Sequence, residues 1–513
     1  GFDVVDKPLL NWYVSEEKKR NGHEIGEVKW KQVKKNHDDT LGQGEDVVYV
    51  IGRVGGEGND VGAGIEDTFE ESGDYLHLNE DELSVLEGLK GMKDDGAIRS
   101  ITVIVNSANP VSMAFADEED YGVDAVLWVG SVGQTGLYAV GDVLSGAVNP
   151  SGSLPDTWWK DNQLDPVQNN FGVYTYEGQE KYTYPANANS YNHYVVYQEG
   201  VYLGYKYTET RYEDVVLGTP NAGNFQYNNV VAYPFGYGLS YTSFSWEVTS
   251  RTPGQGFSVS RDSVYTTTVR VTNTGNRAGR DVVQLYCTPP YSKGGIEKAS
   301  TVLVAYAKTK LLEPGESQEV ELSFTLDDVA SYDAYDKNGD GFSGYELDAG
   351  AYIVELKRNA HELADCDFAR TQLNLRDTVQ CGEDLRTGST VTNRFTGDSA
   401  ADGVSIDGSN SGADIAWLTR ADFAGTFPAK CDPDRQITDN VAALNLYGEQ
   451  DVESDAADYQ GLIGQGTYFD GRGSGNKAAH QLTDDGELTE FARSLGENYN
   501  DEDWDALLDD LSV

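Results

Sequence analysis

A single carboxylate surrounded by glycines stands out in the first part of the chain. Glu57 lies within EDVVYVIGRVGGEGND, after a run of β-forming residues and between Gly56 and Gly58. Glycines on both sides let the backbone and a ligand approach the carboxylate closely. Partial desolvation in a closed cleft would raise its pKa toward neutrality, and such an acid is able to protonate a glycosidic oxygen. From the residues alone, a catalytic acid and a plain solvated turn residue both remain open.

An anion-binding loop explains the glycines less well. Gly52, Gly55 and Gly58 are spaced three apart, which does not match GxGxxG, and the following IEDTFEES adds carboxylates that repel phosphate. VGSVGQTG (Val129–Gly136) is a better candidate because it joins an expected strand to a helix start. It lacks the Lys and Ser/Thr of a P-loop, so tight strand-to-helix packing is the favoured interpretation.

A second acidic stretch has the spacing of a calcium-binding loop. DKNGDGFSGYE places Asp336, Asn338 and Asp340 at positions 1, 3 and 5 and Gly341 at position 6. Position 12, which needs a bidentate Glu, is Leu347, and strands rather than helices are expected on both sides. A polar hairpin is therefore favoured, and weak calcium binding stays an alternative.

Cysteine and histidine spacing indicates neither a metal site nor a cofactor. The four cysteines, Cys287, Cys366, Cys381 and Cys431, show no CxxC spacing, and the six histidines are isolated. Cys366 and Cys381 either pair in an oxidising compartment or remain thiols. Aromatic residues crowd between residues 161 and 232. Their rings either stack on sugars or pack in half-buried loops.

Glu57 needs a scaffold, and the first part of the chain alternates strand and helix patterns. Val47–Ile51 and Ser100–Pro110 have the composition of buried strands, and Ala125–Gly146 reads as strand, glycine loop and helix. Asn79–Glu82 forms a capping-box pattern before a helix. These alternations predict a mainly parallel sheet covered on both faces. Ligands bind at the carboxyl ends of strands in such sheets, and Glu57 follows one of those ends.

The patterns predict a multidomain chain of class α/β plus all-β. An α/β domain is expected over residues 1–245 and an immunoglobulin-like β-sandwich over residues 246–360, where short strands alternate with turns. Residues 361–499 are expected to form a connector region with scattered strands. Residues 500–513 end in a short amphipathic helix pattern.

Charge and hydropathy exclude several classes of partner. The chain has 38 Lys and Arg against 85 Asp and Glu, a formal net charge of −47. Nucleic acids and anionic membrane surfaces need a positive footprint and are therefore excluded as partners, whereas a neutral sugar is not repelled. No apolar run reaches membrane-spanning length. A cytoplasmic and a secreted location both stay open.

Four stretches together resemble glycoside hydrolase family 3: IGRVGGEGND, VLWVGSVGQTGLYAVGDVLSGAVNPSGSLPDTWW, AYPFGYGLSYTSF and VTNTGNRAGRDVVQLY. The strings NPSGxLPxT and YPFGYGLSYTxF are specific in this order, and the resemblance covers residues 1–360. It implies an α/β sandwich followed by a fibronectin type III-like domain. It also implies a retaining, exo-acting, β-glucosidase-like enzyme that acts on β-glucosides or oligosaccharides without a metal or cofactor.

The resemblance also assigns site residues. The acid/base of the family is the Glu of a GEGxD motif, which falls on Glu57, and Asp60 is the Asp of that motif. Val61 stands where an Arg is usual, so this chain departs from the motif at that position. Asp60, Tyr174 and Tyr176 are expected to bind the substrate, and aromatic side chains between Tyr174 and Tyr207 to border its aglycone side.

The nucleophile of the family is an Asp on a (β/α)8 barrel, which these residues do not contain. The first strand of the sandwich is also expected to be missing before Gly1. Members with swapped domain order reconcile both points, because LTRADFAGTFP (Leu418–Pro428) resembles their inter-domain connection and EDWDALLDDLSV the first helix of their barrel. A barrel domain or subunit is therefore expected as a partner, and an oligomer with it. The alternative is a catalytically inactive carbohydrate-binding or scaffolding protein, and a nucleotide-binding α/β protein is a weaker third hypothesis.

Overall fold

The structure is a computed structural model. It describes residues 7–17, 26–37, 40–42, 46–53, 55, 75–116, 118–133, 135–171, 174, 175, 178, 193–219, 222–385, 387–390 and 417–429. One compact unit comprises Gly1–Tyr174, Tyr194–Ser399 and Ser405–Pro433, and a second comprises Thr175–His193, Ala400–Val404 and Asp434–Val513. Apart from Thr175 and His193, the elements described below belong to the first unit.

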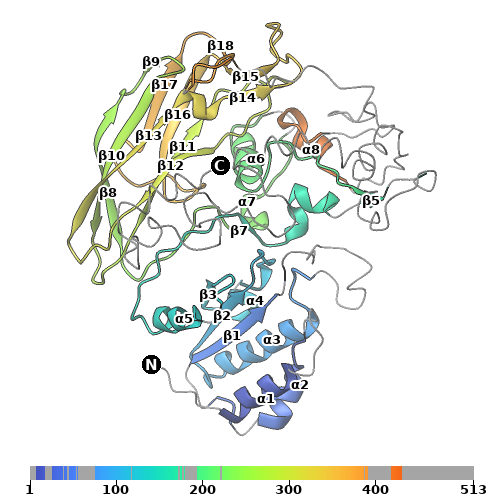
Figure 1. Ribbon diagram of the computed structural model, residues 1–513. Coiled ribbons are helices and arrows are strands. Elements are labelled where there is room, and N and C mark those ends of the chain that lie inside the picture. Colours follow the sequence, from blue (N-terminus) through green and yellow to red (C-terminus); the bar gives the residue numbers. More distant parts are fainter. Residues whose placement is uncertain are drawn as a thin grey trace, which may run out of the picture. The chain divides into compact units, whose positions relative to one another are not determined.

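A three-stranded parallel sheet forms the centre of the α/β part (Figure 1). Its order is β1 (Asp46–Gly52), β2 (Ser100–Asn106) and β3 (Ala125–Trp128). The register places Val50 beside Ile104 and Ile104 beside Leu127. Val, Ile and Leu fill these strands because a parallel strand has to bury apolar side chains against helices. The parallel sheet predicted from the sequence is confirmed.

Helix α3 (Glu80–Asp94) packs on the sheet through Val85, Leu86 and Leu89, which join the strand residues in one buried core. Its neighbours along the chain are α1 (Lys7–Glu17), α2 (Trp30–His37) and α4 (Glu118–Tyr121). Burying each Val or Leu contributes about 1.5–3 kcal/mol relative to leaving it exposed. None of the helices in the described ranges is both long and apolar enough to cross a bilayer.

One face of β1 is exposed, whereas both faces of the sheet were expected to be covered. Val48 and Val50 are 47% and 53% exposed, whereas Tyr49 and Ile51 on the other face are buried. The alternation in a strand sends successive side chains to opposite faces, so the described residues cover β1 on one face only.

Further elements lie between the α/β part and the sandwich in the sequence, or follow the sandwich. Helix α5 (Leu137–Leu144) follows the glycine loop after β3. The two-residue strand β4 (Trp158–Trp159) pairs antiparallel with β7 (Val231–Tyr233), and β5 (Tyr174–Thr175) with β6 (His193–Tyr194) forms another two-stranded sheet. The remaining helices are α6 (Tyr205–Val216), α7 (Tyr227–Val230) and α8 (Phe423–Thr426).

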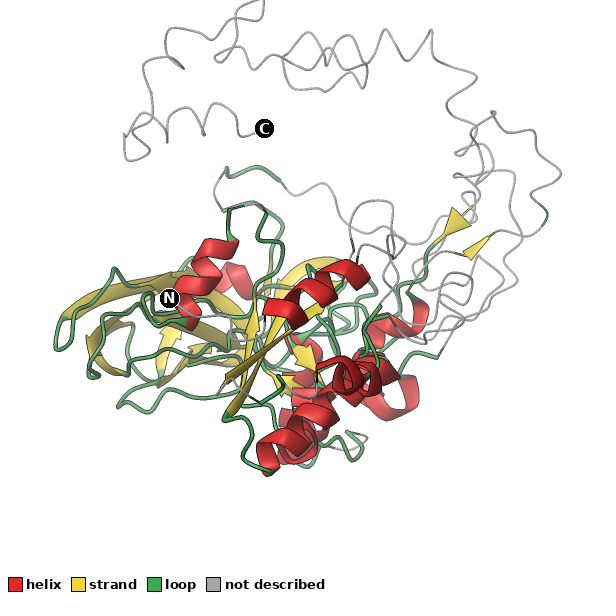
Figure 2. Ribbon diagram, turned by 90° about the horizontal axis from the view of Figure 1, so that it is seen from below, coloured by secondary structure: helices red, strands yellow, loops and turns green. Residues whose placement is uncertain are grey.

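The all-β part is a sandwich of a three-stranded sheet, β13-β10-β8, and a five-stranded sheet, β12-β11-β16-β17-β9, with a small sheet β14-β15-β18 beside them. Figure 2, in which strands are yellow and loops green, shows that this part consists mainly of strands joined by loops and turns. The strands are β8 (Phe244–Thr252), β9 (Phe257–Val259), β10 (Val264–Asn273), β11 (Val282–Thr288), β12 (Val302–Lys308), β13 (Ser317–Thr325), β14 (Ser331–Asp333), β15 (Gly344–Leu347), β16 (Gly350–Lys357), β17 (Arg370–Leu375) and β18 (Val379–Gln380).

The sandwich core follows from the alternation along its strands. On β10, every second side chain from Tyr265 to Val271 is buried, and the side chains of Tyr265, Val269 and Val271 meet those of β11 and β16 in one core. Strand β17 pairs antiparallel with β16, so this sheet extends past residue 360, where the sequence pattern had placed the end of the domain.

The cysteines of the described residues are thiols. Cys287, Cys366 and Cys381 are free, so Cys366 and Cys381 do not form the disulfide that was one alternative. Burial raises the pKa of the Cys381 thiol to about 11, which keeps it in the unreactive protonated form at neutral pH. Cys431 lies outside the described residues.

Candidate active-site edge of the α/β sheet

The three parallel strands end at one edge, and hydrogen bonds join their ends. The backbone N–H of Arg53, just past β1, donates to the carbonyl of Asn106 at the end of β2 (3.1 Å). The indole N–H of Trp128, the last residue of β3, donates to the carbonyl of Ser107 (2.7 Å). Because ligands of parallel α/β sheets bind at the carboxyl ends of the strands, this edge is the candidate site.

Arg53 holds together the two ends of the segment that carries Glu57. Its side chain is buried and donates to the carbonyls of Gly52 (2.9 Å), Tyr75 (2.6 Å) and His77 (2.8 Å). Gly52 precedes the segment and Tyr75 and His77 follow it. A guanidinium has five N–H donors in a fixed plane, so one Arg is able to satisfy several carbonyls from both sides of a loop.

Glu82 balances the charge of Arg53. Both carboxylate oxygens accept from the guanidinium at 2.8 Å, and the carboxylate is buried as well. The same carboxylate closes the capping box of α3: it accepts from the backbone N–H of Asn79 (2.9 Å), while the Asn79 side chain accepts from the backbone N–H of Glu82 (2.9 Å). The position of α3 is thereby coupled to the ends of the Glu57 segment.

The predicted site residues themselves are not tested by this geometry. Glu57, Asp60 and Tyr176 lie outside the described residues. Tyr174 lies in β5, of which the structure describes only the backbone. Their roles therefore stay predictions. The sequence analysis found the capping box but missed Arg53 and its pairing with Glu82.

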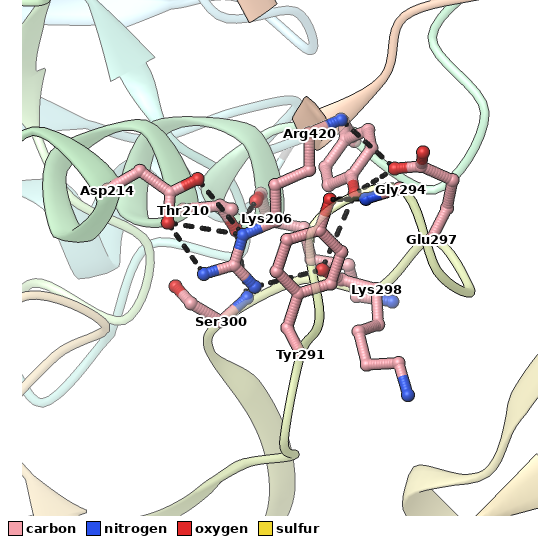
Figure 3. Close-up of polar contacts among 10 residues, drawn as sticks. Lys206, Thr210, Asp214, Tyr291, Gly294, Glu297, Lys298, Ser300 and Arg420 are labelled. Carbon is pink, nitrogen blue, oxygen red and sulfur yellow. Dashed lines mark hydrogen bonds and ion pairs between the residues drawn. The ribbon is translucent and has the colours of Figure 1, made fainter. Parts of the chain in front are cut away.

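A second buried ion pair ties the expected inter-domain connection to α6 (Figure 3). Arg420 donates to both carboxylate oxygens of Asp214, with the shortest contact at 2.7 Å, and both side chains are buried. The guanidinium also donates to the carbonyl of Lys298 (3.3 Å) and lies over the ring of Tyr291, 4.2 Å from its centroid.

Neighbouring contacts hold the same connection in place. The carboxylate of Glu297 accepts from the hydroxyls of Tyr202 and Thr419 and from the backbone N–H of Arg420. Phe423 is fully buried and packs edge-on against Tyr202, with ring centroids 5.0 Å apart. The connection is therefore fixed both by charge and by apolar packing.

A cavity of about 250 Å³ borders this ion pair and is also lined by Glu213, Tyr291 and Lys293. Its lining includes none of the residues at the carboxyl ends of β1, β2 and β3, so it is not the candidate site. Among the described residues, no group of three His, Cys, Asp or Glu side chains is arranged to hold a metal ion.

Two family models match the chain. The glycosyl hydrolase family 3 C-terminal domain matches residues 15–205, and the fibronectin type III-like domain matches residues 281–360. A β-glucosidase of Ruminococcus albus is 31% identical over 365 residues, which is 70% of this chain and 32% of that protein. β-Glucosidase A of Butyrivibrio fibrisolvens is 35% identical over 243 residues, 46% of this chain and 25% of that protein.

Solved structures of β-glucosidases are also similar to this chain. A β-glucosidase from Paenibacillus barengoltzii has a TM-score of 0.52 at 30% identity, covering 69% of this chain and 33% of that one. β-Glucosidase 3B from Thermotoga neapolitana in complex with glucose has a TM-score of 0.51 at 27% identity, covering 73% and 45%.

The chain thus spans about a third or less of these two curated relatives and less than half of these two structures. The resemblance stated from the sequence is confirmed. The chain therefore carries a glycosyl hydrolase family 3 C-terminal domain over residues 15–205 and a fibronectin type III-like domain over residues 281–360.

Proposed function

We propose that this chain is the acid/base-carrying part of a retaining, exo-acting β-glycosidase. The substrate is a β-glucoside or an oligosaccharide with a terminal, non-reducing β-linked sugar. The proposal is supported by the matching family 3 domain and by the relatives, which are named β-glucosidases. The net charge of −47 agrees with a neutral substrate.

The observation that carries the proposal is the clamp formed by Arg53. Arg53 binds carbonyls on both sides of the segment that contains Glu57, at the carboxyl end of β1. A catalytic carboxyl has to be held within a fraction of an ångström of its working position, and rigid ends are a condition for that. The buried pairing with Glu82 supports this, because it fixes the guanidinium that binds both ends.

In this function Glu57 acts twice. As an acid it protonates the glycosidic oxygen while a carboxylate nucleophile attacks the anomeric carbon and forms a glycosyl-enzyme. As a base it then takes a proton from the water that hydrolyses this intermediate. In retaining enzymes the two carboxyl groups are about 5–5.5 Å apart. The nucleophile is an Asp of a (β/α)8 barrel, present as a further domain or subunit, and Asp60, Tyr174 and Tyr176 border the sugar.

The test is Glu57→Gln in the complete enzyme, purified with every polypeptide that accompanies the chain. Loss of a general acid costs about 10²–10⁴-fold in rate. We expect that loss for aryl β-glucosides with poor leaving groups, a smaller loss for good leaving groups, and partial recovery with azide, which replaces the base step. The matched control is Glu70→Gln, the same change in the same segment.

An unimpaired Glu57→Gln enzyme, or an equal loss in Glu70→Gln, would remove Glu57 from the mechanism. An intact-mass measurement of the native assembly tests the nucleophile separately. A chain that carries no barrel and co-purifies with none, and that has no hydrolytic activity, would instead support the carbohydrate-binding or scaffolding alternative.

A further inference from the structure

Two buried carboxyl side chains share one face of the β14–β15 hairpin. The register pairs Asp333 with Gly344 and Ser331 with Glu346, so Asp333 and Glu346 are diagonal neighbours on the same face. They are 1% and 0% exposed. A charged carboxylate in such a position needs a compensating charge or several hydrogen bonds.

The loop between these strands is the stretch with calcium-loop spacing. Asp336 and Gly341 have positive φ angles of 52° and 84°. The glycine at position 6 of a calcium loop makes this kind of sharp turn. The oxygens of Asp336, Asn338 and Asp340 accept hydrogen bonds from the backbone N–H groups of Gly341 (3.1 Å), Asp340 (3.1 Å) and Phe342 (2.9 Å), in that order.

Glu346 connects the strand to this loop, but only one of its two carboxylate oxygens has a hydrogen-bond partner. Its Oε2 accepts from the Asn338 side-chain amide (2.6 Å), whereas its Oε1 is buried without a hydrogen-bond partner. A cation at this point would pair with both oxygens.

We propose that this hairpin binds one Ca²⁺ ion through Glu346 and the loop oxygens of Asp336, Asn338 and Asp340. Glu346, one residue before the usual position 12, supplies the strand carboxylate. Asp333 shapes the loop instead, because it accepts from the backbone N–H groups of Tyr335 (3.1 Å) and Lys337 (2.6 Å).

Ion binding requires a local rearrangement, since no three acidic side chains of the described residues are already arranged around a metal position. The Asn338 amide has to rotate so that its oxygen replaces its NH₂ group beside Glu346. Asp336 has to turn to the ion from the backbone N–H of Gly341, and Asp340 from the backbone N–H of Phe342 and the side-chain amide of Gln380 (2.9 Å). Asn338 and Asp340 are exposed, so these movements displace solvent and not packed side chains. The donors are all oxygens, which Ca²⁺ binds in flexible shells of 6–8 ligands, whereas Mg²⁺ demands a near-ideal octahedron.

The experiment is a calorimetric titration of the full chain with CaCl₂ alone, after removal of divalent ions with a chelator. About 0.5 M NaCl should be present, because salt screens diffuse binding to the acidic surface. We expect one site per chain with Kd below about 10⁻³ M, the weaker end of known calcium loops, and a rise in the unfolding midpoint of the sandwich. Titration with MgCl₂ alone should give binding at least about tenfold weaker.

Glu346→Gln and Asp340→Asn should each weaken Ca²⁺ binding by at least about tenfold, because each removes a charged ligand. Asp340 is exposed, so its variant keeps the fold even if the variant of buried Glu346 does not. Glu321→Gln, at an exposed position of β13, is the matched control and should bind as the parent does. No saturable site up to about 10 mM CaCl₂, equal binding of Mg²⁺, or unchanged binding by Asp340→Asn would overturn the proposal.

Discussion

Arg53 and Glu82 are 29 residues apart and form a bidentate ion pair at the carboxyl end of β1. The pair joins three structural features, namely the end of the first strand, the first turn of α3, and the carbonyls of Tyr75 and His77. Because both charges are buried, each depends on the other for compensation.

Glu82→Gln should therefore destabilise the α/β part by about 3–5 kcal/mol, since it leaves a buried guanidinium without its counter-charge. The free energy of unfolding is measured by urea titration with tryptophan fluorescence. Glu80→Gln is the control, because Glu80 is an exposed acid in the same first turn of α3. Similar losses in both variants would show that charge at the helix N-terminus, and not the pairing with Arg53, is responsible.

Two glycines of α3 should respond in opposite directions to the same substitution. A Cβ at Gly88 would lie 2.1 Å from the ring of Trp30, whereas a Cβ at Gly91 meets nothing within 4 Å. Alanine favours a helix over glycine by about 1 kcal/mol. Gly91→Ala should gain part of that amount in the free energy of unfolding. Gly88→Ala should lose about 1–3 kcal/mol, because Trp30 has to move away from the helix.

The comparison needs only the two variants and the parent under one set of conditions. A gain in stability for Gly88→Ala would mean that Trp30 is not held against α3. The α3–Trp30 contact would then be too weak to help fix the helix that carries Glu82.

The Asp214–Arg420 ion pair should hold residues 417–429, the expected inter-domain connection, against α6. Asp214→Asn leaves the Arg420 charge buried and unpaired, which costs about 3–5 kcal/mol. Replacing both residues, as in Asp214→Asn with Arg420→Met, removes the unpaired charge and should restore much of that loss. Hydrogen exchange of residues 417–429 is the measurement. Fast exchange in the single variant and slower exchange in the double variant are expected, and equal exchange in the two would contradict the pairing.

The sequence analysis predicted local features and missed the long-range pairs, for a physical reason. The apolar strands, the Asn79–Glu82 capping box and the sandwich strands follow from patterns within one element. Asp214 and Arg420 are 206 residues apart, and no spacing rule relates positions so distant. Glu82 was recognised as part of a capping box because it lies only three residues after Asn79. Its other partner, Arg53, is brought to it only by the tertiary fold, which places the start of α3 beside the end of β1.

The exposed face of β1 shows the same limit. Val48 and Val50 were expected to be covered because apolar parallel strands are normally buried on both faces. The described residues leave both side chains about half exposed. A strand pattern predicts that a side chain is buried, but it does not identify which part of a protein packs against it.

A half-buried carboxyl group in the segment after β4 should make stability depend on pH. Asp165 caps the short 3₁₀ helix Pro166–Asn170, and its carboxylate accepts from the backbone N–H of Val167 (3.1 Å). Burial, with smaller contributions from the charges of Asp156 and Glu199, raises the pKa of Asp165 to about 7 despite that hydrogen bond. In the unfolded chain the carboxyl ionises near pH 4, so between about pH 4 and 7 the folded protein holds a proton that the unfolded chain has lost.

Stability should therefore fall as pH rises from about 4 to 7 and level off above that range, with an upper bound of about 4 kcal/mol for this group. Asp165→Asn keeps the cap but cannot ionise, so the variant should be as stable as the parent near pH 4 and more stable at pH 8. Urea titrations at several pH values give the difference in the free energy of unfolding between the variant and the parent. Taking this difference cancels the contributions of all other titratable groups. A difference that stays constant from pH 4 to 8 would contradict the prediction. It would mean that Asp165 has the same pKa in the folded and the unfolded chain, so that burial does not raise it in solution.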